Sequence, residues 1–287
     1  MIDGEIALSD TEFARVKARV FAVAGISLSD AKRTLVVSRL SKVLRRLGIG
    51  SFDAYLDFLD HGATEIEAQE FINALTTNLT RFFREEHHFA HLCEQVGAMM
   101  TRPSRFSADG RPRLRIWSAG CSTGQEPYTI ALSLLDAHPA LVEWDFRVLA
   151  TDIDTSVLAK AEQGVYPASE LSGLSAERTQ LFERRGSLIR VPAAARDVVS
   201  FKALNLVDPV WPMRGPFEAI FCRNVTIYFD RKTQGSLFAR LGAKLAPGGF
   251  LYIGHSESLG QGGGGFRLVG KTIYQVRPAS QGEREVA

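Results

Sequence analysis

The sequence has no apolar stretch near the length of about 20 residues that a membrane-spanning helix requires. The apolar run at 20–24 follows three basic residues, as the apolar part of a secretory signal would. However, acidic residues precede it, and the run is too short for such a signal. We therefore expect a cytoplasmic protein.

Cysteine is scarce, and there is little excess charge of either sign. Cys93, Cys121 and Cys222 show no Cys-x-x-Cys spacing, which argues against a disulfide framework or a thiolate zinc site. The formal net charge of +2 is too small to indicate a dedicated nucleic-acid binder. His87 and His91 are one helical turn apart but have no evident third ligand, so we expect a surface or packing role and no bound metal.

The first hundred residues carry helical patterns with no strand signal between them. Predicted helices cover residues 10–24, 30–47, 52–62, 64–78 and 87–100. Glycines at 25 and 48 fit helix ends. These patterns predict a small helical domain over residues 1–100. A linker over 101–112 follows, with two prolines and a glycine.

Short apolar runs alternate with helical segments in the rest of the chain, over 113–287. Predicted strands cover 114–119, 146–150, 198–203, 217–222 and 250–254, predicted helices cover 126–138, 155–163 and 231–245, and a closing antiparallel hairpin covers 266–269 and 273–276. The alternation predicts an α/β domain with a Rossmann-like, mostly parallel sheet. Residues 164–196 interrupt it, and there we predict an inserted β-subdomain with a helix over 176–184.

Polar residues follow the predicted strands at the edge where an open α/β sheet binds its ligand. The loop after the first strand lacks the Gly-x-Gly-x-x-Gly spacing of a dinucleotide site, and its Glu126 suits an ammonium group better than a phosphate. Asp152 is placed to accept hydrogen bonds from a ribose diol, Asp154 to cap the next helix, and Asn205 to read an adenine edge. S-adenosylmethionine combines an ammonium group, a ribose and an adenine without a phosphate.

Five segments carry specific patterns: 76–85 (TTNLTRFFRE), 117–128 (WSAGCSTGQEPY), 151–154 (TDID), 221–229 (FCRNVTIYF) and 254–257 (GHSE). In this order they resemble the bacterial chemotaxis receptor methyltransferases of the CheR family, over nearly the whole chain. The resemblance implies a class I S-adenosylmethionine-dependent methyltransferase fold with a helical amino-terminal domain and an inserted β-subdomain. It also implies an enzyme that esterifies glutamates on the cytoplasmic helices of receptors, leaving S-adenosylhomocysteine.

By resemblance, cofactor contacts fall on Asn78, Thr80, Arg84, Glu126, Asp152, Asn205, Leu206, Arg223 and Asn224. Arg84 is expected on the cofactor's carboxylate, opposite Glu126 on its ammonium. The segment 78–84 must then fold back over the site.

A glutamate acceptor has an unperturbed pKa of about 4.3 and needs no general base at neutral pH. Catalysis then consists mainly of aligning oxygen, methyl and sulfur. This agrees with a sequence in which we find no Ser/His/Asp or Cys/His arrangement. Arg223 and Tyr228 follow the fourth predicted strand, and we predict that they orient the acceptor.

Basic residues lie largely on one side of the helix predicted over 30–47, opposite its apolar face. They are Lys32, Arg39, Lys42, Arg45 and Arg46. Two interpretations stay open: a solvated face, or a docking surface for the acidic methylation helices of a receptor.

The chain departs from the family pattern in two ways. Gly120 and Gln125 stand where members often carry Ala and Glu, a mild change beside the intact Glu126. Members that bind a receptor's carboxy-terminal peptide have a longer glycine-rich loop in the subdomain than residues 184–190 provide. We therefore hypothesise that this protein does not use that peptide as a tether.

Two other functions are disfavoured. Methyltransferases that modify base amino groups typically carry Asn/Asp-Pro-Pro-Tyr/Phe after the fourth strand, where this chain has Asn-Val-Thr-Ile at 224–227. A cofactor-binding regulator without turnover would show damage at Glu126, Asp152 or the Arg223–Asn224 pair, and these residues are intact.

Overall fold

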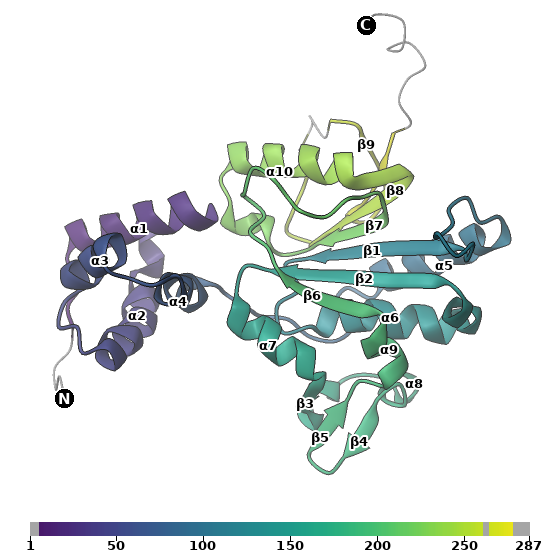
Figure 1. Cartoon of the computed structure of the whole chain (residues 1–287), viewed down its shortest axis with the longest axis horizontal. Helices are drawn as coiled ribbons and strands as arrows, with labels where there is room; N and C mark the ends of the chain where they lie inside the picture. Colours follow the sequence, from purple (N-terminus) through teal and green to yellow (C-terminus); the bar gives the residue numbers. More distant parts are fainter. Residues whose placement is uncertain (1–5, 261–263, 278–287) are drawn as a thin grey trace, which may run out of the picture.

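The computed structural model describes residues 6–260 and 264–277. It contains an amino-terminal group of helices and a larger α/β part in which helices cover both faces of a sheet (Figure 1). Within the described ranges, none of the helices has the length and apolarity needed to cross a membrane.

Four amino-terminal helices form one apolar cluster of their own. They are α1 (Asp10–Ala24), α2 (Arg33–Leu47), α3 (Phe52–His61) and α4 (Glu65–Leu75). Local signals set several of their ends. Ser9 and Glu12 form a capping box at the start of α1, and Gly25 ends it with a φ of 67°. A 3-10 turn, η1 (Asp30–Lys32), precedes α2, so the helix predicted from residue 30 begins with a tighter turn.

Helix α4 ends at Leu75 and not at residue 78 as predicted. Thr76 takes an extended backbone conformation, and its hydroxyl has two acceptors within hydrogen-bonding distance, Asn73 O at 2.9 Å and the carboxylate of Asp154 at 2.6 Å. This long-range bond outweighs the local helical pattern, because a helix continuing past Thr76 would carry the hydroxyl away from Asp154.

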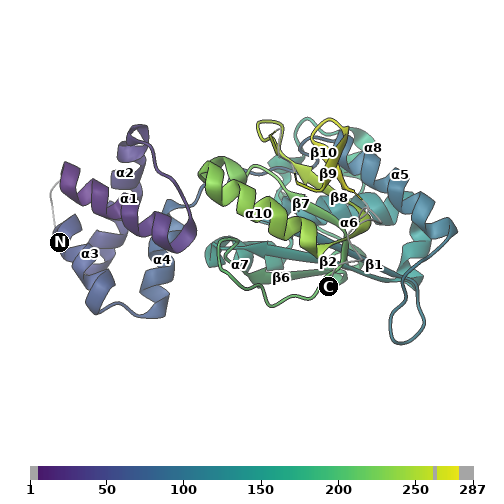
Figure 2. The same ribbon diagram turned by 90° about the horizontal axis from the view of Figure 1, so that it is seen from above.

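The predicted boundary of the helical domain at residue 100 is wrong. Helix α5 (His87–Thr101) packs against the α/β part, where Phe89 stacks on Phe221 with ring centroids 5.7 Å apart. Both views place α5 on the side of the sheet away from α1–α4 (Figure 1, Figure 2). The helical domain therefore ends near residue 76, and the loop at 102–112 connects two elements of the same domain.

The main sheet has the strand order β6-β2-β1-β7-β8-β10-β9. Its strands are β1 (Arg113–Ala119), β2 (Asp145–Asp152), β6 (Val199–Ala203), β7 (Phe217–Cys222), β8 (Leu245–Ile253), β9 (Phe266–Gly270) and β10 (Ile273–Val276). The first five in this order pair in parallel, and β10 pairs antiparallel with both β8 and β9. The predicted parallel sheet and closing hairpin are confirmed.

Helices cover the two faces of the sheet. On one face, α5, α6 (Gln125–Ala137), α7 (Thr155–Gln163) and α9 (Ala193–Asp197) contribute to a cluster with Ile116 and Phe221. On the other face, α10 (Arg231–Lys244) packs on Trp117 and Ile220. Because both faces are covered, every residue of β7 and five of the seven residues of β1 are buried, as expected for central parallel strands.

A second, three-stranded antiparallel sheet forms the inserted subdomain, with the order β3-β5-β4. Its elements are β3 (Val165–Pro167), η3 (Ala168–Leu171), α8 (Ala176–Thr179), β4 (Glu183–Arg185) and β5 (Leu188–Arg190). The helix predicted over 176–184 is thus wrong beyond Thr179. Phe182 packs on Phe82 with ring centroids 4.7 Å apart, and the residues after it pair with β5.

Candidate active site

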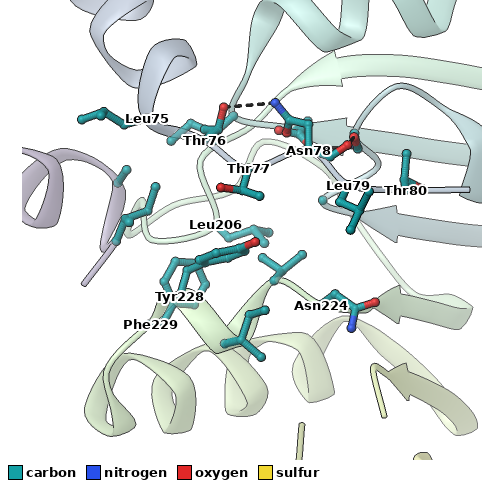
Figure 3. A pocket seen from close by; sticks show the side chains of 18 of the residues that line it. Leu75, Thr76, Thr77, Asn78, Leu79, Thr80, Leu206, Asn224, Tyr228 and Phe229 are labelled. Carbon is teal, nitrogen blue, oxygen red and sulfur yellow. Dashed lines mark hydrogen bonds between the residues drawn. The ribbon is translucent and has the colours of Figure 1, made fainter. Parts of the chain in front are cut away.

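A pocket of about 450 Å³ lies where the carboxyl ends of the parallel strands face the helical domain. Strand β1 pairs with β2 on one side and with β7 on the other, so the strand order switches direction at β1. Doubly wound sheets bind their ligands in the crevice at such a switch point. Figure 3 shows side chains from residues 75–80 opposite Leu206, Tyr228 and Asn224 across this space. All nine predicted cofactor residues line it, together with Tyr228 and Lys32.

The loop between β1 and α6 forms the floor of the pocket. Gly120 N and Cys121 N both donate to Thr151 O, at 2.8 and 2.9 Å, so the loop folds over the end of β2. Gly120 has a φ of 87°, and a Cβ atom there would lie 2.3 Å from Val225 Cγ2. Only glycine allows this close approach without displacing Val225. The Cys121 side chain is buried, in agreement with a packing role.

Asp152 and Asp154 hold different positions at the end of β2. Asp152 lines the pocket and accepts from Ser122 N at 2.8 Å and Asp154 N at 2.9 Å. Burial raises the pKa of the Asp152 carboxyl, against the opposing effect of these backbone donors. Asp154 caps α7 through Ser156 N at 2.9 Å, as predicted. Asp152 is thus the carboxylate of this pair that a ligand meets.

Glu126 is buried at the start of α6 and also faces the pocket. It accepts from Ser118 Oγ at 2.7 Å and from Arg223 Nη1 at 3.0 Å. Burial raises the pKa of Glu126 although Arg223 acts in the opposite direction. A cationic ligand group at Glu126 would therefore share this carboxylate with Arg223.

Glu85, for which the sequence predicts no role, joins the same ion-pair network. Its carboxylate lies 3.4 Å from Arg223 Nη2 and 3.1 Å from His255 Nδ1. Burial raises the pKa of Glu85, but Arg223 and the hydrogen bonds from His255 outweigh this, so the pKa is lowered. The only sequence signal was its place in the TRFFRE segment, because its partners are far away in the chain.

The segment 76–85 forms the roof of the pocket, as expected from the resemblance. Asn78 Nδ2 donates to Asp154 Oδ2 at 2.7 Å, and Ser122 Oγ donates to Asn78 O at 3.0 Å. Phe82 and Phe83 anchor the segment by burying their rings in the apolar cluster that includes α5 and α6. Arg84 lines the pocket, with its guanidinium bonded to Leu79 O at 3.0 Å.

The helical domain forms the remaining wall. Asn205 Nδ2 donates to Val23 O at 2.7 Å, and Ser27 N donates to Tyr228 O at 2.8 Å. Asn205 Oδ1 accepts from Val207 N at 3.2 Å, which leaves one N–H and one lone pair of its amide for a ligand. The ring of Tyr228 extends into the pocket (Figure 3).

The five basic residues predicted as a docking surface do not share one role in the structure. Arg39 donates to the carbonyl groups of Ala74 and Thr76, which fixes the end of α4. Arg46 pairs with Glu70, and Lys32 lines the pocket. The remaining two, Lys42 and Arg45, are exposed on α2.

None of the three histidines of α5 lines the pocket, and they pack against the sheet. His88 bonds to Thr272 Oγ1 at 2.9 Å and His91 to Tyr252 Oη at 3.0 Å. Burial lowers the pKa of His88 to about 3, so its ring is neutral at physiological pH. Among the described residues, no group of His, Cys, Asp and Glu side chains is placed to hold a metal ion.

Known proteins with similar sequences indicate which family the chain belongs to and what the pocket binds. Residues 78–275 match the family model of the CheR methyltransferase SAM-binding domain, and residues 11–76 match the CheR methyltransferase all-alpha domain. This division coincides with the structural boundary near residue 76.

Curated relatives match the chain over almost its full length. The chain is 43% identical to the chemotaxis protein methyltransferase of Salmonella typhimurium, over 94% of this chain and 92% of that protein. The Escherichia coli chemotaxis protein methyltransferase is 42% identical over the same shares, 94% and 92%. Chemotaxis protein methyltransferase 2 of Pseudomonas aeruginosa is 44% identical over 92% of each chain. The predicted class I fold and S-adenosylmethionine as cofactor are confirmed, and the chain belongs to the CheR family of chemotaxis protein methyltransferases.

Proposed function

We propose that the protein transfers a methyl group from S-adenosylmethionine to glutamate carboxylates on the cytoplasmic helices of methyl-accepting chemotaxis receptors. The products are glutamate methyl esters and S-adenosylhomocysteine. The enzyme works in the cytoplasm and reaches the membrane only through the receptor. Neither a metal ion nor a nucleic acid takes part.

The proposal depends on the absence of a histidine, a cysteine or an unpartnered carboxylate from the described lining of the pocket. Its described lining contains no histidine or cysteine, and both of its carboxylates have partners, Glu126 in Arg223 and Asp152 in two backbone N–H groups. An amine or hydroxyl acceptor would have to lose a proton during the reaction. A glutamate, with an unperturbed pKa of about 4.3, arrives already ionised. Lys32, Arg81 and Arg84 line the same pocket and favour an anionic acceptor.

The cofactor assignment follows from the positions of three side chains. Glu126 would hold the ammonium group of the cofactor and Asp152 its ribose diol; both are buried carboxylates that line the pocket. Asn205 offers the adenine edge the N–H and the lone pair that its internal bonds leave unused. The bound sulfonium supplies an activated methyl group. The protein's contribution is to align it with the acceptor oxygen.

Tyr228 and Arg223 have different places in this proposal. The Tyr228 ring extends into the pocket and is placed to orient the acceptor carboxylate through its hydroxyl. The Arg223 guanidinium is buried and bound to Glu85, Glu126 and Arg84 O. The sequence predicts that Arg223 orients the acceptor. We propose instead that it holds the cofactor end of the site.

The tail tether remains excluded from the proposal. In the subdomain, β4 and β5 are joined by Gly186 and Ser187 alone, in a turn where Gly186 has a φ of 63°. Such a tight turn leaves no extended loop to hold a receptor peptide. The exposed charges of α2, centred on Lys42 and Arg45, are proposed instead as the contact for acidic receptor helices.

The activity itself is tested with labelled methyl transfer to receptor-containing membranes. We expect label on the receptor that base releases as methanol, since a methyl ester hydrolyses in base and an N-methyl group does not.

Asp152→Ala should lose binding of S-adenosylhomocysteine in calorimetry. Tyr228→Phe should keep that binding and lose about 100-fold in turnover, the scale for one lost transition-state hydrogen bond. Label that survives base, or full turnover in the Phe variant, would contradict the corresponding assignment.

The role of the roof is tested at two adjacent glutamates. Glu85→Gln removes the charge that pairs with Arg223, so we expect the dissociation constant of S-adenosylhomocysteine to rise about tenfold, close to 1.4 kcal/mol. Glu86→Gln is the matched control, because Glu86 is exposed and pairs with Arg178. Equal dissociation constants for the two variants would remove Glu85 from the site.

Docking through α2 is tested with Lys42→Glu/Arg45→Glu. We expect KM for the receptor to rise about tenfold at low salt and the difference to shrink at high salt, because exposed charges are screened. The same reversals at exposed positions of the β9–β10 hairpin, Arg267→Glu/Lys271→Glu, serve as the control. An unchanged KM in the α2 variant would leave its charges as a solvated face.

The absence of a tether is tested with an isolated carboxy-terminal receptor peptide. Calorimetry should detect no binding to the protein at micromolar concentrations. Saturable micromolar binding would show that the short subdomain turn still supports a peptide contact.

A further inference from the structure

Glu257 is a buried carboxylate to which neither the family comparison nor the proposed mechanism assigns a role. Glu257 is 7% exposed and lies just after β8. Five donors converge on its two oxygens: Asn224 N at 2.8 Å and Gly254 N at 2.6 Å on Oε2, and Thr226 N at 2.7 Å, Thr226 Oγ1 at 2.8 Å and Ile227 N at 3.3 Å on Oε1. An ionised carboxylate only accepts hydrogen bonds, so this set of donors matches it closely.

Four of these donors belong to the loop that follows β7, residues 223–228, which we call the β7 loop. It carries Arg223 and Asn224 at the cofactor end of the pocket and Tyr228 at the proposed acceptor position. Asn224 has a φ of 58°, a conformation that a non-glycine residue rarely adopts without support. The Glu257 carboxylate supplies that support from outside the pocket lining.

Gly254 brings Glu257 and the β7 loop together. A Cβ atom at Gly254 would lie 2.4 Å from Asn224 Nδ2 and 2.9 Å from Asn224 N. Glu257 N donates to Gly254 O at 2.9 Å, which closes a turn over residues 254–257. The turn therefore packs against Asn224 without a side chain between them.

We infer that Glu257 is a positioning residue: it fixes the β7 loop so that Arg223, Asn224 and Tyr228 face the pocket in one fixed arrangement. For the cofactor end, the inference rests only on the family's use of S-adenosylmethionine. For Tyr228, it rests on the proposed function. Alignment is the main task in this reaction, and a displacement of about 1 Å costs on the order of 100-fold in rate.

A second buried glutamate separates positioning from simple stabilisation. Glu218 is also 7% exposed and lies on β7, the strand that leads into the β7 loop. It accepts from Arg115 N at 2.7 Å and pairs with Arg105 at 3.2 Å, near the amino ends of the strands and away from the pocket residues. Glu218→Gln therefore reports the cost of neutralising a buried, bonded carboxylate in the same part of the fold.

The test compares Glu257→Gln with Glu218→Gln. An amide nitrogen in place of either Glu257 oxygen leaves at least two of the five donors without an acceptor. We expect Glu257→Gln to raise the dissociation constant of S-adenosylhomocysteine about tenfold and to lower kcat about 10- to 100-fold. Glu218→Gln should lower the melting temperature while both constants stay within about twofold of the wild type. If Glu257→Gln lowers only the melting temperature, as its control does, the inference is overturned.

Gly254→Ala provides a second route to the same loop. It keeps every Glu257 oxygen but pushes Asn224 away, so it should reproduce the kinetic defect of Glu257→Gln. It also decides the matter if Glu257→Gln does not fold, and wild-type binding and turnover in Gly254→Ala would then overturn the inference. Wild-type protein that binds S-adenosylhomocysteine but methylates no receptor would refute the proposed function alone, since the dissociation constants still test Glu257.

Discussion

The buried guanidinium of Arg223 holds the pocket together. It pairs with Glu126 from the start of α6 at 3.0 Å and with Glu85 from the roof at 3.4 Å. Removing one partner of a buried ion pair typically costs about 3–5 kcal/mol, because the remaining charge stays desolvated. The closed roof is therefore stable only while both carboxylates pair with Arg223. A binding site for a cationic cofactor is thus built around a cation of the protein itself.

The roof requires such a fastening because its backbone is strained. Phe83 and Glu85 have φ values of 56° and 59°, each a conformation that costs a non-glycine residue on the order of 1–3 kcal/mol. Burial of the Phe83 ring, which Arg178 covers at 4.1 Å from the centroid, offsets part of this cost. The ion pair between Glu85 and Arg223 adds to that compensation. Strain is thus placed in the segment that must bend from α4 over the pocket.

Local signals made most of the fold predictable, and tertiary contacts explain the exceptions. The ends of α1 and the alternation of strands and helices follow from caps and periodicity, which depend on neighbouring residues. The end of α4 depends on a bond from Thr76 to Asp154, and the place of α5 depends on its packing against Phe221. Neither can be derived from periodicity, since an amphipathic helix shows that it has a buried face but not what covers that face.

The same distinction applies to the site. Glu126 and Asp152 were predictable because Asp152 ends β2 and Glu126 lies in the first turn of α6, after the loop that follows β1. Parallel strands bring such positions together at one edge of the sheet. Glu85 and Glu86 are indistinguishable as neighbouring letters, yet Glu85 is partly buried beside Arg223 and Glu86 is exposed beside Arg178. The proposed reaction needs alignment and no base, so it gives its supporting carboxylates no chemical signature of their own. Their function lies in the geometry they impose, so only the folded structure distinguishes them from other glutamates.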